Sequence, residues 1–442
     1  MKSILRKVLL VAGCTASIVS CGDEPINEVV RDGVGLIVVR SEISNGLSGN
    51  IKFEIPPGTS SFLIEVRGDR GRYTLAEFKT PNGRDQISGG GFVTRGAIEV
   101  PGLVDWLYPN DGATGIASGN YSMTIVGRDG GGSNVSEDID VLIYLSEPKP
   151  QKTCGIKLDF LIDDRALSAA TVADGKAIER IVERVDLNLR QVGTKIIDYN
   201  VQRVDMQSPD IDLGNGSATR IVDDVLSQTL YTSPPAARAD SVHVMVVRQV
   251  GGSDHPNFDP LGYSMGLPGP YSPSRDTSAV LVSTEAFARN GNLDADGLAS
   301  SLAHEVGHFL GLYHTSEKLG AAHDPLDDTP TCSNSLSCTD EFKRNIMSSS
   351  FWLAGASPAS RNRFSEKQGN IMRGHPLCIP MQVTVVPPPI ETCDLECTAP
   401  NTCAVLSGRL SCERACDPSS ATPCDTGTCQ SGQLGTYVCQ SE

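Results

Sequence analysis

One short segment, residues 303–314 (AHEVGHFLGLYH), constrains this chain more than any other, because it holds three of the seven histidines. The residues around it predict a helix, for which Asp296 is a suitable N-cap. Apolar residues recur at helical spacing at Leu298, Leu302, Val306 and Leu310. Gly311 suits the position just after a helix end, where the backbone often needs a positive φ. The segment therefore predicts a helix followed by a sharp turn.

The three histidines and a neighbouring glutamate have the spacing of a metal site. A helix places His304 and His308 on one face, where both can reach one Zn²⁺ at roughly 2.0–2.1 Å. The turn at Gly311 brings back His314 as a third ligand, which leaves one position open, as in catalytic zinc sites. Glu305 is not directed at the metal, but it can take a proton from a metal-activated water and pass it to a leaving amine. The pattern predicts zinc-dependent hydrolysis of peptide bonds, with Glu305 as general base and acid.

The full pattern HExxHxxGxxH resembles that of the metzincin zinc metallopeptidases. Metzincins also have a methionine turn beneath the metal, and the segment RNIMSSS places Met347 in that role. Within the metzincins, the chain is most similar to the pappalysin and cytophagalysin group. The segments that carry this similarity are LGYSMGLPGP (261–270), HEVGHFLGLYHT (304–315), DDTPTC (327–332), NIM (345–347) and FSEKQGNIMR (364–373). The resemblance implies a zinc endopeptidase with an extended substrate along an edge strand, which we expect at residues 278–287.

The resemblance also implies a calcium site. The residues at the place where pappalysin-like enzymes bind calcium are Asp324, Asp327, Asp328 and Thr329. An acidic solvated loop is the alternative for the same residues. One departure from the group is Ser349, because these enzymes usually have a tyrosine two residues after the turn methionine.

The fourteen cysteines indicate an oxidising compartment. Eight of them crowd the last fifty residues, so residues 392–442 are predicted to be a disulfide-rich module. Between the N-terminal segment and that module lie Cys154, Cys332, Cys338 and Cys378. We expect the pairs Cys154–Cys378 and Cys332–Cys338. A latent Cys154 thiol held on the zinc is the alternative, but it would leave one of the other cysteines unpaired.

Residues 1–21 have the pattern of a lipoprotein signal peptide, with a basic start, a short apolar stretch and the sequence SIVSCG. Cys21 is the expected lipid attachment site, since Cys14 would leave too short an apolar stretch. An ordinary cleaved signal is the alternative. We expect an exported protein, anchored by lipid at the bacterial outer membrane or cell surface or otherwise secreted. The formal net charge of −16 argues against nucleic acid as a partner.

The chain is expected to be multidomain. Short alternating strands separated by turn residues predict an antiparallel β-sandwich, and strands interleaved with helices predict an α/β catalytic domain of the metzincin type. The expected order is signal peptide 1–21, tether 22–34, β-sandwich 35–146, linker 147–153, catalytic domain 154–382, proline-rich linker 383–391 and Cys-rich module 392–442.

A surface adhesin or binding protein with a vestigial peptidase domain is the rival hypothesis. The intact pattern of three histidines and a glutamate argues against it, because a decayed site would be expected to lose one of them. A purely structural zinc is a third hypothesis, and it predicts that replacing Glu305 has no effect. The sequence shows no signal of an oligomer, and the expected partner is a protein or peptide substrate.

Overall fold

The computed structural model describes most of the chain between residues 26 and 381 and four C-terminal strands. The described residues are 26–30, 34–88, 101–149, 152–163, 165–166, 176–206, 208–213, 225, 240–251, 261–271, 278–289, 292–317, 322–332, 340–349, 361–381, 401–406, 409–414, 428–431 and 437–440. The signal peptide with Cys21, the proline-rich linker 383–391 and Cys338 lie outside them. The chain divides into two compact units, Met1–Met381 and Gln382–Glu442.

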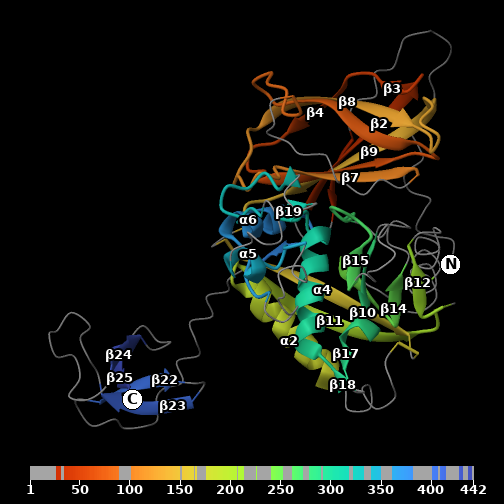
Figure 1. Ribbon diagram of the computed structural model, residues 1–442. Coiled ribbons are helices and arrows are strands. Elements are labelled where there is room, and N and C mark those ends of the chain that lie inside the picture. The colour runs from red at the N-terminus through yellow and green to blue at the C-terminus, as the bar shows by residue number, and fades with distance from the viewer. Residues whose placement is uncertain are drawn as a thin grey trace, which may run out of the picture. The chain divides into compact units, whose positions relative to one another are not determined.

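The N-terminal part of the first unit is a nine-stranded antiparallel sheet (Figure 1). Its strands are β1 (Ile26–Val30), β2 (Val34–Ser44), β3 (Leu47–Ser48), β4 (Ile51–Ile55), β5 (Ser61–Arg67), β6 (Arg72–Lys79), β7 (Leu103–Tyr108), β8 (Gly119–Arg128) and β9 (Glu137–Ser146). Seven of them run in the order β4-β8-β3-β2-β9-β5-β7, while β1 pairs with β2 and β6 with β8. The sequence predicts a sandwich of two sheets, but these strands form one continuous sheet that curls over its own core. Strand β1 lies within the range 22–34 that was expected to be a tether.

Alternation along the strands gives this sheet two apolar faces. The face inside the curl packs aromatic rings together, and Phe53, Phe62 and Tyr121 are almost fully buried there. The opposite face contributes Leu107 and Tyr144 to the core of the catalytic domain. The ring of Tyr144 lies 4.8 Å from that of Tyr271. The sheet and the catalytic domain therefore share one hydrophobic core.

The catalytic domain is built on a six-stranded sheet. Its strands are β10 (Cys154–Asp163), β11 (Thr194–Val204), β13 (Val242–Val247), β15 (Gly262–Ser264), β16 (Ala279–Ser283) and β21 (Ile379–Pro380). Five of these run in the order β11-β10-β13-β16-β15, with β15 antiparallel at the edge, and β21 pairs with β10. We expected the open edge at residues 278–287, but β16 lies between β13 and β15, so the edge on this side is β15.

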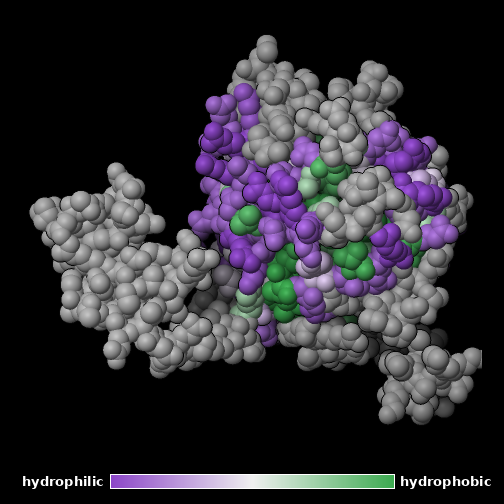
Figure 2. Space-filling model, turned by 90° about the horizontal axis from the view of Figure 1, so that it is seen from below, coloured by the Kyte–Doolittle hydropathy of each residue, from purple (hydrophilic) through white to green (hydrophobic). Residues whose placement is uncertain are grey.

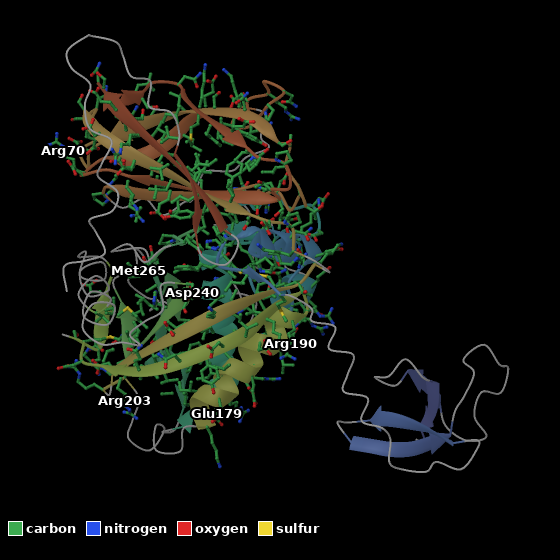
Figure 3. All side chains as sticks on the ribbon, turned by 180° about the vertical axis from the view of Figure 1, so that it is seen from behind. Arg70, Glu179, Arg190, Arg203, Asp240 and Met265 are labelled. Atoms are coloured by element: carbon green, nitrogen blue, oxygen red, sulfur yellow. A yellow bond between two sulfur atoms is a disulfide. The ribbon has the colours of Figure 1, made fainter. Side chains whose placement is uncertain are left out.

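Most of the described helices of this domain follow β16 in the chain. The helices are α2 (Lys176–Arg190), the 3₁₀ turn η4 (Glu285–Phe287), α4 (Ala295–Phe309), α5 (Asp340–Arg344) and α6 (Glu366–Gly374). On α2, Ile181, Val185 and Leu189 follow helical spacing and are buried. Seven of the other residues of that helix are charged, and Figure 3 places Glu179 and Arg190 along it.

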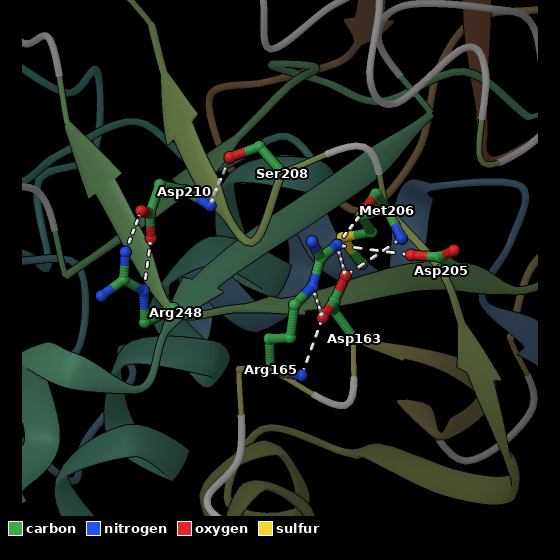
Figure 4. A network of polar contacts seen from close by, with 7 residues as sticks. All are labelled: Asp163, Arg165, Asp205, Met206, Ser208, Asp210 and Arg248. Carbon is green, nitrogen blue, oxygen red and sulfur yellow. Dashed lines mark hydrogen bonds and ion pairs between the residues drawn. The ribbon is translucent and has the colours of Figure 1, made fainter.

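Short ladders connect the larger elements. They are β12 (Asp210–Asp212) with β14 (Gln249–Gly251), β17 (Ala288–Arg289) with β18 (Asn292–Leu293), and β19 (Ser316–Glu317) with β20 (Ala322–His323). Polar contacts near the end of β10 and in the ladder of β12 with β14 are drawn in Figure 4. The Asp163 carboxylate accepts hydrogen bonds from the Met206 amide and from Arg165, and Arg248 pairs with Asp210.

The second unit contains two hairpins. They are β22 (Asn401–Leu406) with β23 (Arg409–Arg414) and β24 (Thr428–Ser431) with β25 (Tyr437–Gln440). The register places Cys403 opposite Cys412 and Cys429 opposite Cys439. Within the described residues, the one disulfide with both partners defined joins Cys154 to Cys378. The side chains of the eight cysteines in residues 392–442 lie outside the described part of the chain, so the expected disulfide framework there stays a prediction.

The surface of the described residues is mixed in polarity. Figure 2 shows apolar residues between hydrophilic ones on the lower face of the molecule. Exposed large apolar side chains include Leu187 on α2, and Ile197, Tyr199 and Val201 on β11. Within the described part of the chain, no helix has the length and apolar character needed to cross a membrane.

Candidate metal centre

Helix α4 carries two of the three predicted metal ligands. The helix begins two residues earlier than expected, because the carboxylate of Asp294 rather than Asp296 accepts the Gly297 amide at 3.0 Å. Asp296 instead pairs with Arg180 and Arg184 on α2, and both contacts hold the two helices side by side. From Gly297 to Phe309 every residue of α4 is buried, since the helix packs against α2, β15 and β16.

The turn after α4 brings the third histidine to the other two. Gly311 has a φ of +102°, which a residue with a side chain rarely adopts. His304, His308 and His314 form the one group of three or more potential metal-binding His, Cys, Asp or Glu side chains within the described ranges. Their Nε2 atoms lie 3.0 to 3.1 Å apart. Nitrogens placed roughly 2.0–2.1 Å from a tetrahedral ion would be about 3.3 Å apart, so the group fits Zn²⁺.

Backbone carbonyls orient two of the imidazole rings. His304 Nδ1 lies 2.6 Å from the Ile346 carbonyl oxygen, and His308 Nδ1 lies 2.6 Å from that of Leu312. A carbonyl oxygen only accepts, so Nδ1 carries the hydrogen in both rings and the Nε2 lone pair points into the cluster. Burial, and then the neighbouring histidines, hold the pKa of His304 and of His308 well below the ordinary value. Both rings are therefore in the neutral form that binds metals.

Glu305 lies beside the histidine cluster and against the edge strand. Its side chain is 7% exposed, and burial raises its pKa to about 8. The backbone amide of Ser264 on β15 donates a hydrogen bond to its carboxylate. A Cβ at Gly262 would come within 2.8 Å of Glu305 Cγ, so only glycine lets the strand approach this closely. The carboxylate is thereby held at the junction of α4 and β15.

Met347 lies in a buried turn against α4. A Cβ on Gly307 would come within 2.6 Å of the Met347 sulfur, which shows how closely the methionine packs on the helix between its two histidines. The turn is held by the Met347 amide, which donates to Asn345 Oδ1 at 2.8 Å, and by the Thr315 amide, which donates to the Met347 carbonyl at 3.1 Å. Ser349 donates from its hydroxyl to the Ser316 carbonyl.

Arg361 is a buried residue of the site that the sequence analysis did not identify. Its side chain is among the best buried of the charged groups, and it donates to the Ser301 hydroxyl at 3.1 Å and the Ile346 carbonyl at 3.4 Å. Its Nη1 atom lies 3.2 Å from His304 Nδ1. The arginine therefore ties the methionine turn to α4 behind the first histidine. No local pattern could have revealed it, because RNRF has the composition of an ordinary polar loop.

The four residues expected to bind calcium do not converge. Asp324 accepts hydrogen bonds from Thr329 Oγ1 at 2.6 Å and from the Leu326 amide. Asp328 instead accepts the Ser365 hydroxyl and the Lys367 amide at the start of α6, and Asp327 pairs with the Lys367 ammonium. The structure therefore gives no support to a calcium site here, and two of the aspartates serve as caps and partners of α6.

The cysteine pairs can be followed in part. Cys154 and Cys378 are joined, at the point where β21 pairs with the start of β10. Cys332 is disulfide-bonded as well, and its expected partner Cys338 lies outside the described residues. Cys154 is therefore not a latent thiol on the metal.

One comparison with known proteins, the match to a family profile, supports a metallopeptidase domain. Residues 175–315 match the sequence profile of the metallo-peptidase family M12B, reprolysin-like. Among solved structures, metalloproteinase-II from Bacteroides fragilis matches with 11% identity and a TM-score of 0.31, over 57% of this chain and 65% of that chain. The match thus spans slightly less than two thirds of that protein. No curated protein matches.

Proposed function

Taking the reprolysin-like metallopeptidase domain at residues 175–315 as the premise, we propose that the chain is a zinc-dependent endopeptidase. The observation that carries this proposal is the convergence of the three histidine Nε2 atoms within 3.1 Å, with Glu305 buried beside them. Three protein ligands leave a fourth position for water or substrate, which distinguishes a catalytic from a structural zinc. A structural zinc would not require a buried carboxylate next to its ligands.

The residues of the site divide the chemical tasks between them. His304, His308 and His314 would hold the zinc, which lowers the pKa of water and polarises a peptide carbonyl when bound. Glu305 would accept a proton as general base and donate it to the leaving amine as general acid. Its hydrogen bond from the Ser264 amide keeps the carboxylate in place for both transfers. Met347 fills the space beneath the cluster and keeps the ligands in register.

Strand β15 supports an endopeptidase that binds an extended substrate. It is the last strand of its sheet, and it runs beside Glu305. A peptide added to this edge would receive backbone hydrogen bonds, while side-chain pockets would supply specificity. The sequence segments shared with pappalysins support membership of that group within the metzincins.

The proposal is tested with a peptide library read by mass spectrometry. The native chain is compared with Glu305→Gln, which keeps the size of the side chain, and with Glu285→Gln, which makes the same change at an exposed position of the same domain. Loss of the general base is expected to slow cleavage by about 10²–10⁴-fold with unchanged zinc content. Glu285→Gln is expected to match the native chain. Equal inactivity of all three proteins with zinc bound would refute the peptidase and favour the adhesin hypothesis.

We also propose that the protein is exported and anchored by a lipid on Cys21, with that lipid as its contact with the membrane. The basic and apolar pattern of residues 1–21 supports this. Radiolabelled fatty acid should be incorporated by the native protein and lost in Cys21→Ser, and incorporation by both proteins would contradict the assignment.

A further inference from the structure

A small cavity lies where three parts of the first unit meet. Its volume is about 140 Å³, and it is lined by the start of β5, the loop after β7, the segment after β9 and the last turn of α6. Three of the lining residues are cationic, namely Lys149, Lys152 and Arg373. No described residue of the lining is acidic, although the chain as a whole carries a net charge of −16. The cavity is therefore a local positive site on an acidic protein.

The cations of this cavity are poorly neutralised. The Lys149 ammonium is partly buried, and its hydrogen bond goes to the neutral Ser146 hydroxyl at 3.3 Å. Burial lowers the pKa of Lys149 to about 8 and outweighs the opposing effect of the Glu147 carboxylate. Arg373 is 7% exposed and donates to the neutral Val192 carbonyl and Asn370 Oδ1.

The third cation is more exposed. Lys152 pairs with Glu366 at 3.2 Å, and both side chains are largely solvent-accessible. Exposed pairs of this kind contribute little, so Lys152 can exchange this partner for another anion. Glu366 also acts on Arg373, and Glu147 acts on Lys149, but burial outweighs the carboxylate in both cases and the pKa of each cation is lowered.

The C-terminal end of α6 would repel an anion in the cavity, because helix C-termini carry partial negative charge. Two contacts weaken that opposition. The terminal Gly374 carbonyl already accepts the Ser61 hydroxyl at 2.6 Å, and the Arg373 guanidinium lies on the same turn. Lys149 and Lys152 come from a different segment of the chain and add charge independent of the helix.

We propose that this cavity binds a small oxyanion of the phosphate or sulfate class, held by Lys149, Lys152 and Arg373. The volume is large enough for a tetrahedral anion, and guanidinium and ammonium donors are the groups that bind such anions most strongly. The bound anion bridges the N-terminal sheet, the connecting segment and α6, and so it strengthens the attachment of the sheet to the catalytic domain. Its occupant is either a free ion or a phosphate ester on a larger molecule.

The test is a titration of the full chain with sodium phosphate, sodium sulfate and phosphoserine, followed by calorimetry and by the melting temperature. Ionic strength is held constant with sodium chloride, which removes general screening. Saturable binding with a rise in melting temperature is expected. Lys149→Gln should weaken binding at least about tenfold, since it removes a charge-assisted hydrogen bond. Lys343→Gln, on α5 and outside the cavity, is the matched control and should bind like the native chain.

The ligand that binds more tightly identifies the class of occupant. Phosphoserine binding as tight as phosphate would support an esterified occupant, and preference for phosphate or sulfate would support a free ion. The proposal would be overturned if sodium chloride raised the melting temperature as much as phosphate does. Equal phosphate binding by the native chain and by Lys149→Gln would also overturn it.

Discussion

Asp324 offers a direct test of how the loop after the metal centre is stabilised. Its carboxylate is 9% exposed, and burial raises its pKa to about 7 from an ordinary value of 3.8. One oxygen accepts the Thr329 hydroxyl, while Oδ2 is buried without a hydrogen-bond partner within the described part of the chain. The folded state therefore binds the Asp324 proton more tightly than the unfolded state does.

The sign of the pH dependence follows from this difference. As pH rises from about 4 to about 7, the unfolded chain has already released the proton and the folded chain has not, so the free energy of unfolding falls. Each pH unit is worth about 1.4 kcal/mol, which gives an upper limit of about 4 kcal/mol lost above pH 7. Asp324→Asn removes this penalty and keeps an oxygen for Thr329. A buried amide hydrogen without an acceptor costs about 1–3 kcal/mol at every pH, so we expect a net gain of about 2 kcal/mol at pH 8 and a net loss of about 2 kcal/mol near pH 4.

The measurement is urea unfolding of native, Asp324→Asn and Asp327→Asn chains between pH 4 and 8. Asp327 is exposed and paired with Lys367, so its substitution should change stability by less than about 0.5 kcal/mol. Calcium should stabilise none of the three. An Asp324→Asn chain no more stable than native at pH 8, or a difference that does not vary with pH, would refute the reasoning. Stabilisation of the native chain alone by calcium would restore the calcium site.

Two further substitutions probe the geometry of the site. Gly311→Ala should lower the free energy of unfolding by about 3 kcal/mol, because it combines backbone strain with a Cβ placed 2.8 Å from Leu107 Cδ2. Gly132→Ala is the control, because Gly132 has a φ of +84° with open space around it, and its free energy of unfolding should fall by only about 1 kcal/mol. Equal losses for the two variants in urea unfolding would exclude a clash between the Cβ added at Gly311 and Leu107. Arg361→Met should lower stability by about 3 kcal/mol and speed zinc release to a chromogenic chelator, because it leaves the Ser301 hydroxyl without this donor and the Ile346 carbonyl with His304 as its donor. Zinc release at the native rate would show that Arg361 does not position His304.

The metal centre was largely predictable, because its geometry is local. Helical spacing alone places His304 and His308 on one face, and a glycine permits the turn that returns His314. The spacing of Ser365 and Gln368 is equally local, and it is typical of the capping box that the structure contains at the start of α6.

The partners of these residues were not predictable, because they come from distant parts of the chain. The Ser264 amide that holds Glu305 belongs to a strand of three residues, too short to show any periodicity. Strand alternation indicates which residues of the N-terminal sheet face inward, but it does not specify which strands pair. For this reason the sequence predicts a sandwich where the strands form one continuous sheet. It also predicts an edge strand at residues 278–287, where β16 lies between β13 and β15.

The contact between Leu107 and the turn at Gly311 links the N-terminal sheet to the most constrained point of the zinc motif. Leu107 is also part of the same core as Val306 and Met347. A recombination event that exchanged the sheet for another module would remove the Leu107 side chain, against which that turn packs. The sheet and the peptidase domain are therefore expected to be inherited together, and a boundary drawn between them by sequence alone would divide one evolutionary unit.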